Sequence, residues 1–71
     1  MTIEQAKQRV AREGGIEIVK YYDTYHLMAV YSWSEGKVKQ MRKAGIPTFK
    51  DGGRNKYDPK LVDAWLKDVF L

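Results

Sequence analysis

The residues from Phe49 to Pro59, FKDGGRNKYDP, predict a tight β-hairpin in the second half of the chain. Gly52 and Gly53 can take the positive φ angles that a tight turn requires, and β-prone residues precede and follow them. Arg54 comes directly after the glycines, so this hairpin would carry a cation at its tip. The function of the protein has to account for this basic hairpin tip.

Helix signals lie on both sides of the hairpin. Thr2 and Gln5 have the spacing of a capping box, and Ile3, Ala6 and Val10 recur after them at helical intervals. Further along the chain, residues that favour helix N-termini stand at three positions: Asp23, Ser34 and Asp58. The helices that these signals predict cover residues 3–13, residues 24 to 30 or 31, residues 35–44, and a last segment from Pro59 onward.

Residues 16–22, IEIVKYY, are β-branched and aromatic with partial alternation, which favours a short strand over a helix. Gly14 and Gly15 precede this segment and offer a left-handed stop to the first helix. We therefore expect a strand here that pairs with the hairpin.

The two central helices have apolar residues where a helix-turn-helix unit needs them. A short helix, a tight turn, a polar second helix and a basic hairpin follow one another in the order of a winged helix-turn-helix. The residues expected to face inward are Leu27, Met28 and Tyr31 on the first helix, Trp33 in the turn, and Val38 and Met41 on the second helix. The last helix adds an apolar stripe of Leu61, Val62, Trp65, Leu66 and Val69.

The length of the chain permits one such unit and no second core. A chain of 71 residues buries only about 60% of its unfolded surface. It contains no cysteine, so packing must stabilise the fold without disulfides or thiolate-bound zinc. We predict a single α+β domain with an N-terminal helix and strand over 1–23, a helix-turn-helix over 24–45, a wing over 46–58 and a C-terminal helix over 59–71.

Positive charge is concentrated in the second helix of this unit and in the hairpin. The formal charge is +4 overall, but residues 35–56 carry seven basic residues against two acidic ones. Such an excess creates a local positive potential that favours a polyanionic partner. A surface that only keeps the protein soluble is the alternative interpretation of the charge alone.

The outward residues of the second helix are the candidates for contact with double-stranded DNA. A helix reads base edges in the major groove from its N-terminal half, which assigns base contacts to Glu35, Lys39 and Gln40. Phosphate contacts fall to Ser34, Lys37 and Lys43. Gly36 is unusual, because glycine in a helix interior costs roughly 1 kcal/mol relative to alanine; it either permits close approach of the backbone to DNA or is a tolerated defect.

Two stretches of this sequence resemble one known family. LMAVYSWSEGKVKQMRKAGIP is similar to the helix, turn, Ser-capped helix and Gly-x-Pro ending of excisionase-type proteins, a branch of the MerR-like winged helix-turn-helix superfamily. FKDGGRNKYDPKLVDAWL is similar to the Gly-Gly-Arg wing of that family and to its closing helix. The resemblance spans residues 24–66, and it departs from the family at Ser32, where the turn often has glycine.

This resemblance implies a small protein that places its second helix in the major groove and its wing tip in an adjacent minor groove. An arginine on a rigid hairpin suits a narrow A·T-rich groove, where the negative potential is strongest. The wing residues assigned to DNA are Lys50, Gly53, Arg54, Asn55 and Lys56. The family also implies cooperative binding of several copies that bend a recombination site and assist an integrase, in a phage or mobile element, or a related role in transcription regulation.

Other classes of function have weaker support in the sequence. His26 is the sole histidine and no cysteine is present, so we expect no metal site, no cofactor and no enzyme activity. A protein-binding winged-helix module in a phage assembly or regulatory complex is the main alternative, with Tyr21, Tyr22 and Tyr25 as its interface. No apolar run reaches the 18 residues of a membrane span, and MTIEQAKQRV lacks a signal-peptide stretch, so a cytoplasmic protein is expected.

Overall fold

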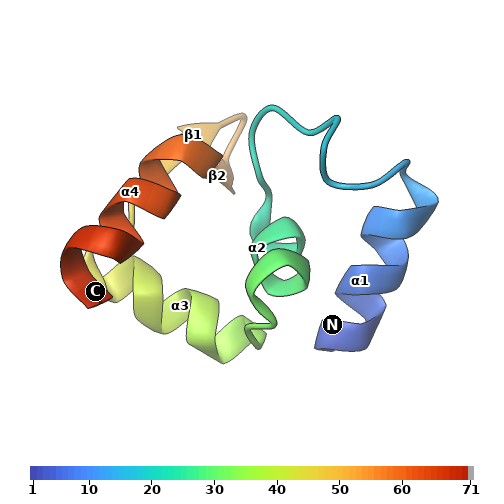
Figure 1. Cartoon of the computed structure of the whole chain (residues 1–71), viewed down its shortest axis with the longest axis horizontal. Helices are drawn as coiled ribbons and strands as arrows, with labels where there is room; N and C mark the ends of the chain where they lie inside the picture. The colour runs from blue at the N-terminus through green and yellow to red at the C-terminus, as the bar shows by residue number, and fades with distance from the viewer. Residues whose placement is uncertain (71) are drawn as a thin grey trace.

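Four helices and one antiparallel hairpin make up the fold, so the predicted α+β class is confirmed. The computed structural model describes residues 1–70, with α2 between α1 on one side and the hairpin and α4 on the other (Figure 1). The elements are α1 (Ile3–Arg12), α2 (Thr24–Tyr31), α3 (Glu35–Ala44), β1 (Phe49–Asp51), β2 (Arg54–Lys56) and α4 (Pro59–Phe70). Leu71 lies outside the described residues.

The caps predicted at Thr2 and Ser34 set the starts of α1 and α3. At α1 the Gln5 backbone N–H donates to Thr2 Oγ1 at 3.1 Å, and the Thr2 N–H donates back to Gln5 Oε1 at 2.8 Å. At α3 the Lys37 N–H donates to Ser34 Oγ at 3.1 Å. Each bond satisfies a backbone donor that has no partner inside its helix, so these helices start where the sequence places them.

The turn between α2 and α3 depends on Ser32. Its φ of 56° lies in the left-handed region, and it is the only residue other than glycine with a positive φ in the part of the chain described. The next residue, Trp33, donates its N–H to the Met28 carbonyl at 3.2 Å, which closes α2 as a left-handed cap does. Ser32 thus takes the conformation that glycine adopts most easily, which gives a physical reason for glycine in turns of this shape.

The core forms where α2 packs on both α1 and α3. Leu27, Met28, Val38 and Met41 are buried, and the partly buried Tyr31 stacks on Trp33 with ring centroids 4.7 Å apart. The predicted inward set of the helix-turn-helix is therefore confirmed. The remaining members of the buried cluster come from α1, the α3–β1 connection, the residue after β2, and α4: Ala6, Ile46, Tyr57 and Val62.

The predicted strand over residues 16–22 is wrong except at its last residue. Tyr22 forms an isolated antiparallel bridge with Tyr57, while the preceding residues form turns and bends. The Val19 N–H donates to the Ile16 carbonyl at 3.1 Å, and Ile18 is 72% exposed. A strand needs a neighbouring backbone to pair with along its whole length. Here the one partner within residues 1–70 is Tyr57, the residue after β2, and it pairs only with Tyr22.

The predicted stripe on α4 is correct for its centre and wrong for its ends. Val62 is fully buried, and Trp65 and Leu66 pack partly buried against the core. Leu61 and Val69 are instead 55% and 53% exposed. Leu61 is exposed because, at 100° per residue, it points about a quarter-turn away from the buried Val62. Val69 is exposed because it lies a full turn beyond Trp65, near the end of α4.

His26 is the one buried polar residue among those described, with 5% of its surface exposed. Its ring lies between Tyr22 and Tyr25, with centroid distances of 5.7 and 4.1 Å. The Asp23 N–H donates to His26 Nδ1 at 2.8 Å, so the fold uses that nitrogen as an acceptor. Nδ1 therefore carries no proton, so the imidazole is in its neutral form. Its hydrogen bond with the Asp23 N–H closes the N-terminus of α2.

We expect the free energy of unfolding to fall as the pH drops through the region below 6.5. Burial lowers the pKa of His26, and Lys56 and Arg9 lower it further, against the carboxylates of Asp23 and Glu13, which raise it. As the pH falls, the unfolded chain then binds more protons than the folded chain. The stability that neutral His26 contributes is therefore fully present above the ordinary histidine pKa of about 6.5 and is lost as the pH falls below it. Thermal unfolding between about pH 7.5 and 5 measures it, and a His26→Gln variant with an equally steep pH dependence would refute it.

Candidate nucleic-acid interface

The hairpin presents two chemically different faces. Its register pairs Phe49 with Lys56, Lys50 with Asn55 and Asp51 with Arg54, and the two-residue turn has positive φ at both glycines. Directly paired residues share a face, so Lys50 and Asn55 lie on one side of the ribbon. Phe49 and Lys56 lie on the other side, where Phe49 makes an edge-to-face contact with Tyr21 at 5.3 Å.

The base of the wing is bonded to the body of the protein. Tyr22 and Tyr57 exchange two backbone hydrogen bonds of 2.7 and 2.8 Å. Lys56 Nζ lies 3.0 Å from Asp23 Oδ1, and both side chains are about one-fifth exposed. Through this ion pair Lys56 anchors the base of the wing, and its sequence-based assignment as a supporting DNA contact stays a prediction.

The outward side of α3 is exposed as expected. Ser34, Glu35, Gly36, Lys37, Lys39, Gln40 and Lys43 are all exposed. Glu35 is the one acidic residue of this set, and its Oε1 lies 3.1 Å from the α-ammonium of Met1. A Cβ added at Gly36 would meet only Ser34 Oγ at 3.8 Å, so the fold itself does not require glycine there.

A hollow of about 390 Å³ joins α3 to the wing. Two predicted DNA contacts from different elements, Lys39 on α3 and Asn55 on β2, line it together. The helix and the wing therefore present these side chains to one common space. The full lining consists of Thr24, Glu35, Gly36, Lys39, Arg42 and Asn55.

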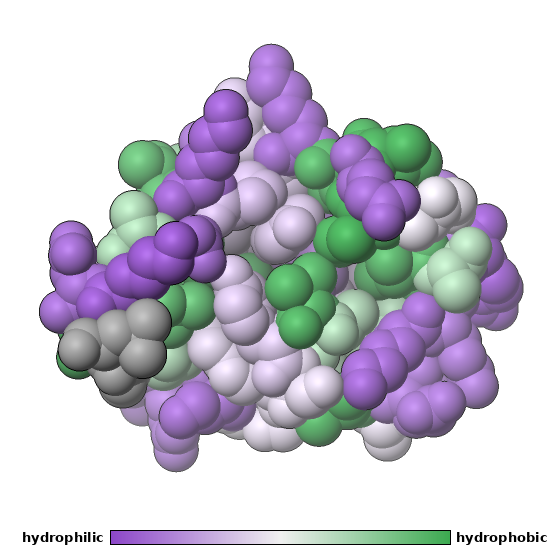
Figure 2. Space-filling view, in the orientation of Figure 1, coloured by the Kyte–Doolittle hydropathy of each residue, from purple (hydrophilic) through white to green (hydrophobic). Residues whose placement is uncertain are grey.

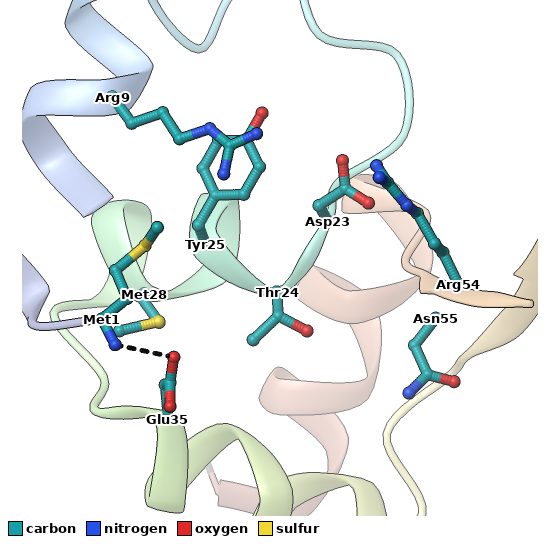
Figure 3. Close-up of a pocket in the computed structure, with 9 residues that line it drawn as sticks. All are labelled: Met1, Arg9, Asp23, Thr24, Tyr25, Met28, Glu35, Arg54 and Asn55. Carbon is teal, nitrogen blue, oxygen red and sulfur yellow. Dashed lines mark hydrogen bonds and ion pairs between the residues drawn. The ribbon is translucent and has the colours of Figure 1, made fainter. Parts of the chain in front are cut away.

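A second hollow of about 310 Å³ continues from the first toward α1. Glu35 and Asn55 line both hollows, and Arg54 and Arg9 line the second (Figure 3). In the close-up, the Arg54 side chain extends back from the hairpin toward Asp23 (Figure 3). Arg54 makes no ion pair within residues 1–70, so its guanidinium is available to a partner.

The remaining predicted contacts lie outside both hollows. Ser34, Lys37, Gln40, Lys43, Lys50 and Gly53 are exposed and Lys56 is half-buried, and none of them lines either hollow. Gln40 follows Lys39 on the outward surface of α3, whereas Lys37 lies about 160° around the helix from Lys39. Of the predicted contacts, Glu35 and Asn55 line both hollows, Gly36 and Lys39 line only the first, and Arg54 lines only the second. Lys37 lies on a different side of α3.

Arg42 is the residue that the sequence-based assignment missed. Its Nη1 donates to the hydroxyl of the buried Tyr57 at 3.0 Å, and its side chain lines the hollow between α3 and the wing. The spacing of three residues from Lys39 places both cations on neighbouring positions of α3, which is the signal that could have identified it.

The tyrosines proposed as a protein interface divide into two kinds. The Tyr25 hydroxyl donates to Glu13 Oε1 at 2.6 Å beneath the Arg9 guanidinium, so it links α1 to α2. Burial and the Glu13 carboxylate raise the pKa of Tyr25 to about 12. Of these three tyrosines only Tyr21 is exposed. In the space-filling view the hydrophobic side chains form separate patches, and hydrophilic side chains project around the rim (Figure 2).

Comparisons with protein-family models, curated protein sequences and solved structures gave no match. Within residues 1–70, no three histidine, cysteine, aspartate or glutamate side chains are grouped so that they could hold a metal ion. None of the helices described is long and apolar enough to cross a membrane.

Proposed function

We propose that the protein binds double-stranded DNA, with α3 in the major groove and the wing in the adjacent minor groove. The proposal rests on the hollow between α3 and the wing, which is lined by both Lys39 of α3 and Asn55 of β2. Arg54 lines the second hollow, which Asn55 also lines. A helix and a hairpin that face one space can engage a single duplex at two neighbouring grooves. Lys39, Gln40 and Glu35 are then the base-reading candidates, and Arg54 is the minor-groove residue.

The resemblance to excisionase-type proteins supports a more particular role. We propose that several copies bind side by side on a recombination or regulatory site in the cytoplasm and bend it, with an integrase as the partner. A single module of this size covers only about 600 to 1,000 Å² of DNA-contacting surface, which favours cooperative binding over tight binding by one copy. Footprinting on the DNA that neighbours the gene would give the site, the spacing and the number of copies.

A salt titration tests DNA binding itself. Each phosphate that a lysine or arginine neutralises contributes about −0.9 to the slope of log K against log salt, so four such contacts predict a slope of about −3 to −4. Fluorescence anisotropy with a labelled duplex measures the slope. A flat salt response, or no binding at low salt, would contradict the proposal.

A protein-binding module is the second candidate, and one observation favours it. Tyr21 and Phe49 form an edge-to-face pair that remains 42% and 41% exposed, on the face of the wing away from Asn55. Exposed aromatic residues are enriched at protein interfaces. This candidate predicts binding that survives high salt and is lost on Tyr21→Ala, whereas DNA binding through α3 is insensitive to that substitution.

A further inference from the structure

The hollow between α3 and the wing contains an arginine that the fold holds in place. Arg42 is half-buried, and its Nη1 donates to Tyr57 Oη at 3.0 Å. Tyr57 is itself fully buried and is fixed by its two backbone hydrogen bonds with Tyr22. The guanidinium therefore needs little further ordering before it binds a ligand, because its side-chain freedom is already restricted.

The charge of the hollow favours an anion. Arg42 lines the hollow and makes no ion pair with a carboxylate in the described part of the chain, and the base-reading candidate Lys39 adds a second positive charge to the same lining. Glu35 is the only acidic side chain in the lining, and it is paired with the α-ammonium of Met1 at 3.1 Å. The amide of Asn55 and the hydroxyl of Thr24 add neutral hydrogen-bond donors to the lining.

We infer that this hollow binds one backbone phosphodiester of duplex DNA, with the Arg42 guanidinium as its main ligand. The inference rests on the proposed function. A helix in the major groove and a wing in the next minor groove are separated by one sugar–phosphate strand, so that strand passes between α3 and the hairpin. Arginine suits this position because its planar fork can donate two parallel hydrogen bonds to phosphate oxygens. Tyr57 is a positioning residue that orients the guanidinium.

The test compares Arg42→Gln with Arg12→Gln on a short mixed-sequence duplex. Arg12 is exposed at the end of α1 and lines neither hollow, so its substitution removes the same charge away from the site. Arg42→Gln should reduce the magnitude of the salt slope by about 0.9 and lower affinity several-fold, whereas Arg12→Gln should leave the slope unchanged. Thermal unfolding of both variants checks that the fold is retained.

A double-mutant cycle with Tyr57→Phe separates positioning from a general structural effect. Tyr57→Phe keeps the buried ring and removes only the hydroxyl, so we expect it to lower DNA affinity in the wild-type background and to have little effect when Arg42 is already glutamine. Equal losses in both backgrounds would overturn the positioning role. This variant also tests the site if Arg42→Gln does not fold.

The outcomes distinguish this inference from the proposed function. A steep slope in the wild-type protein together with an unchanged slope in Arg42→Gln overturns the phosphate site alone. A wild-type protein without salt-dependent DNA binding overturns the proposed function and this site together.

Discussion

Replacing Leu27 with alanine is expected to lower the free energy of unfolding by about 2–5 kcal/mol. Leu27 is fully buried on α2, which packs against both α1 and α3. Removing its side chain therefore leaves a cavity at the point where the three helices meet. At about 0.05–0.15 kcal/mol per residue, a chain of 71 residues has only about 4–11 kcal/mol of stability, so this one change removes a large part of it.

Leu61→Ala is the matched control for this prediction. It deletes the same atoms from a leucine that is mostly exposed on α4, so its expected cost is within about 0.5 kcal/mol. Urea-induced unfolding monitored by circular dichroism measures both variants. Similar losses at Leu27 and Leu61 would mean that the core is not centred on α2.

Replacing Arg54 with alanine is expected to weaken DNA binding by about 1–3 kcal/mol and to leave the fold intact, given the proposed function. The Arg54 side chain is exposed, makes no ion pair within residues 1–70, lines the second hollow and extends from the hairpin toward Asp23 (Figure 3). The loss should be larger on A·T-rich duplexes than on G·C-rich ones, because a narrow minor groove concentrates negative potential.

Arg12→Ala supplies the control of equal charge on α1, and it should change affinity little on either duplex. Lys56→Ala supplies a second contrast. Lys56 is paired with Asp23, so its loss should loosen the base of the wing as well as reduce binding, and thermal unfolding would reveal this. An Arg54→Ala protein that binds both duplexes like the wild type would show that the wing does not contact DNA.

Local sequence signals predicted the elements with strong capping and turn chemistry. The Thr2 and Ser34 caps, the paired glycines of the hairpin and the apolar residues of α2 and α3 each act over a few residues, so their outcome could be inferred without knowledge of the fold. The segment over residues 16–22 could not be judged in this way. Its β-prone composition gave a reasonable local expectation, but a strand forms only where a second backbone lies alongside it.

The candidate site shows the same division. The sequence by itself determined that a basic helix precedes a basic hairpin, that both are exposed, and that the helix-turn-helix core joins α2 to α3, because spacing and polarity decide which side of each element faces water. Only the tertiary structure decided which cations act together. It paired Lys56 with Asp23 and brought Arg42 against the Tyr57 hydroxyl fifteen residues further along the chain. Such partners lie far apart in the sequence, so local spacing does not reveal them, and the fold brings them together around the buried Tyr57.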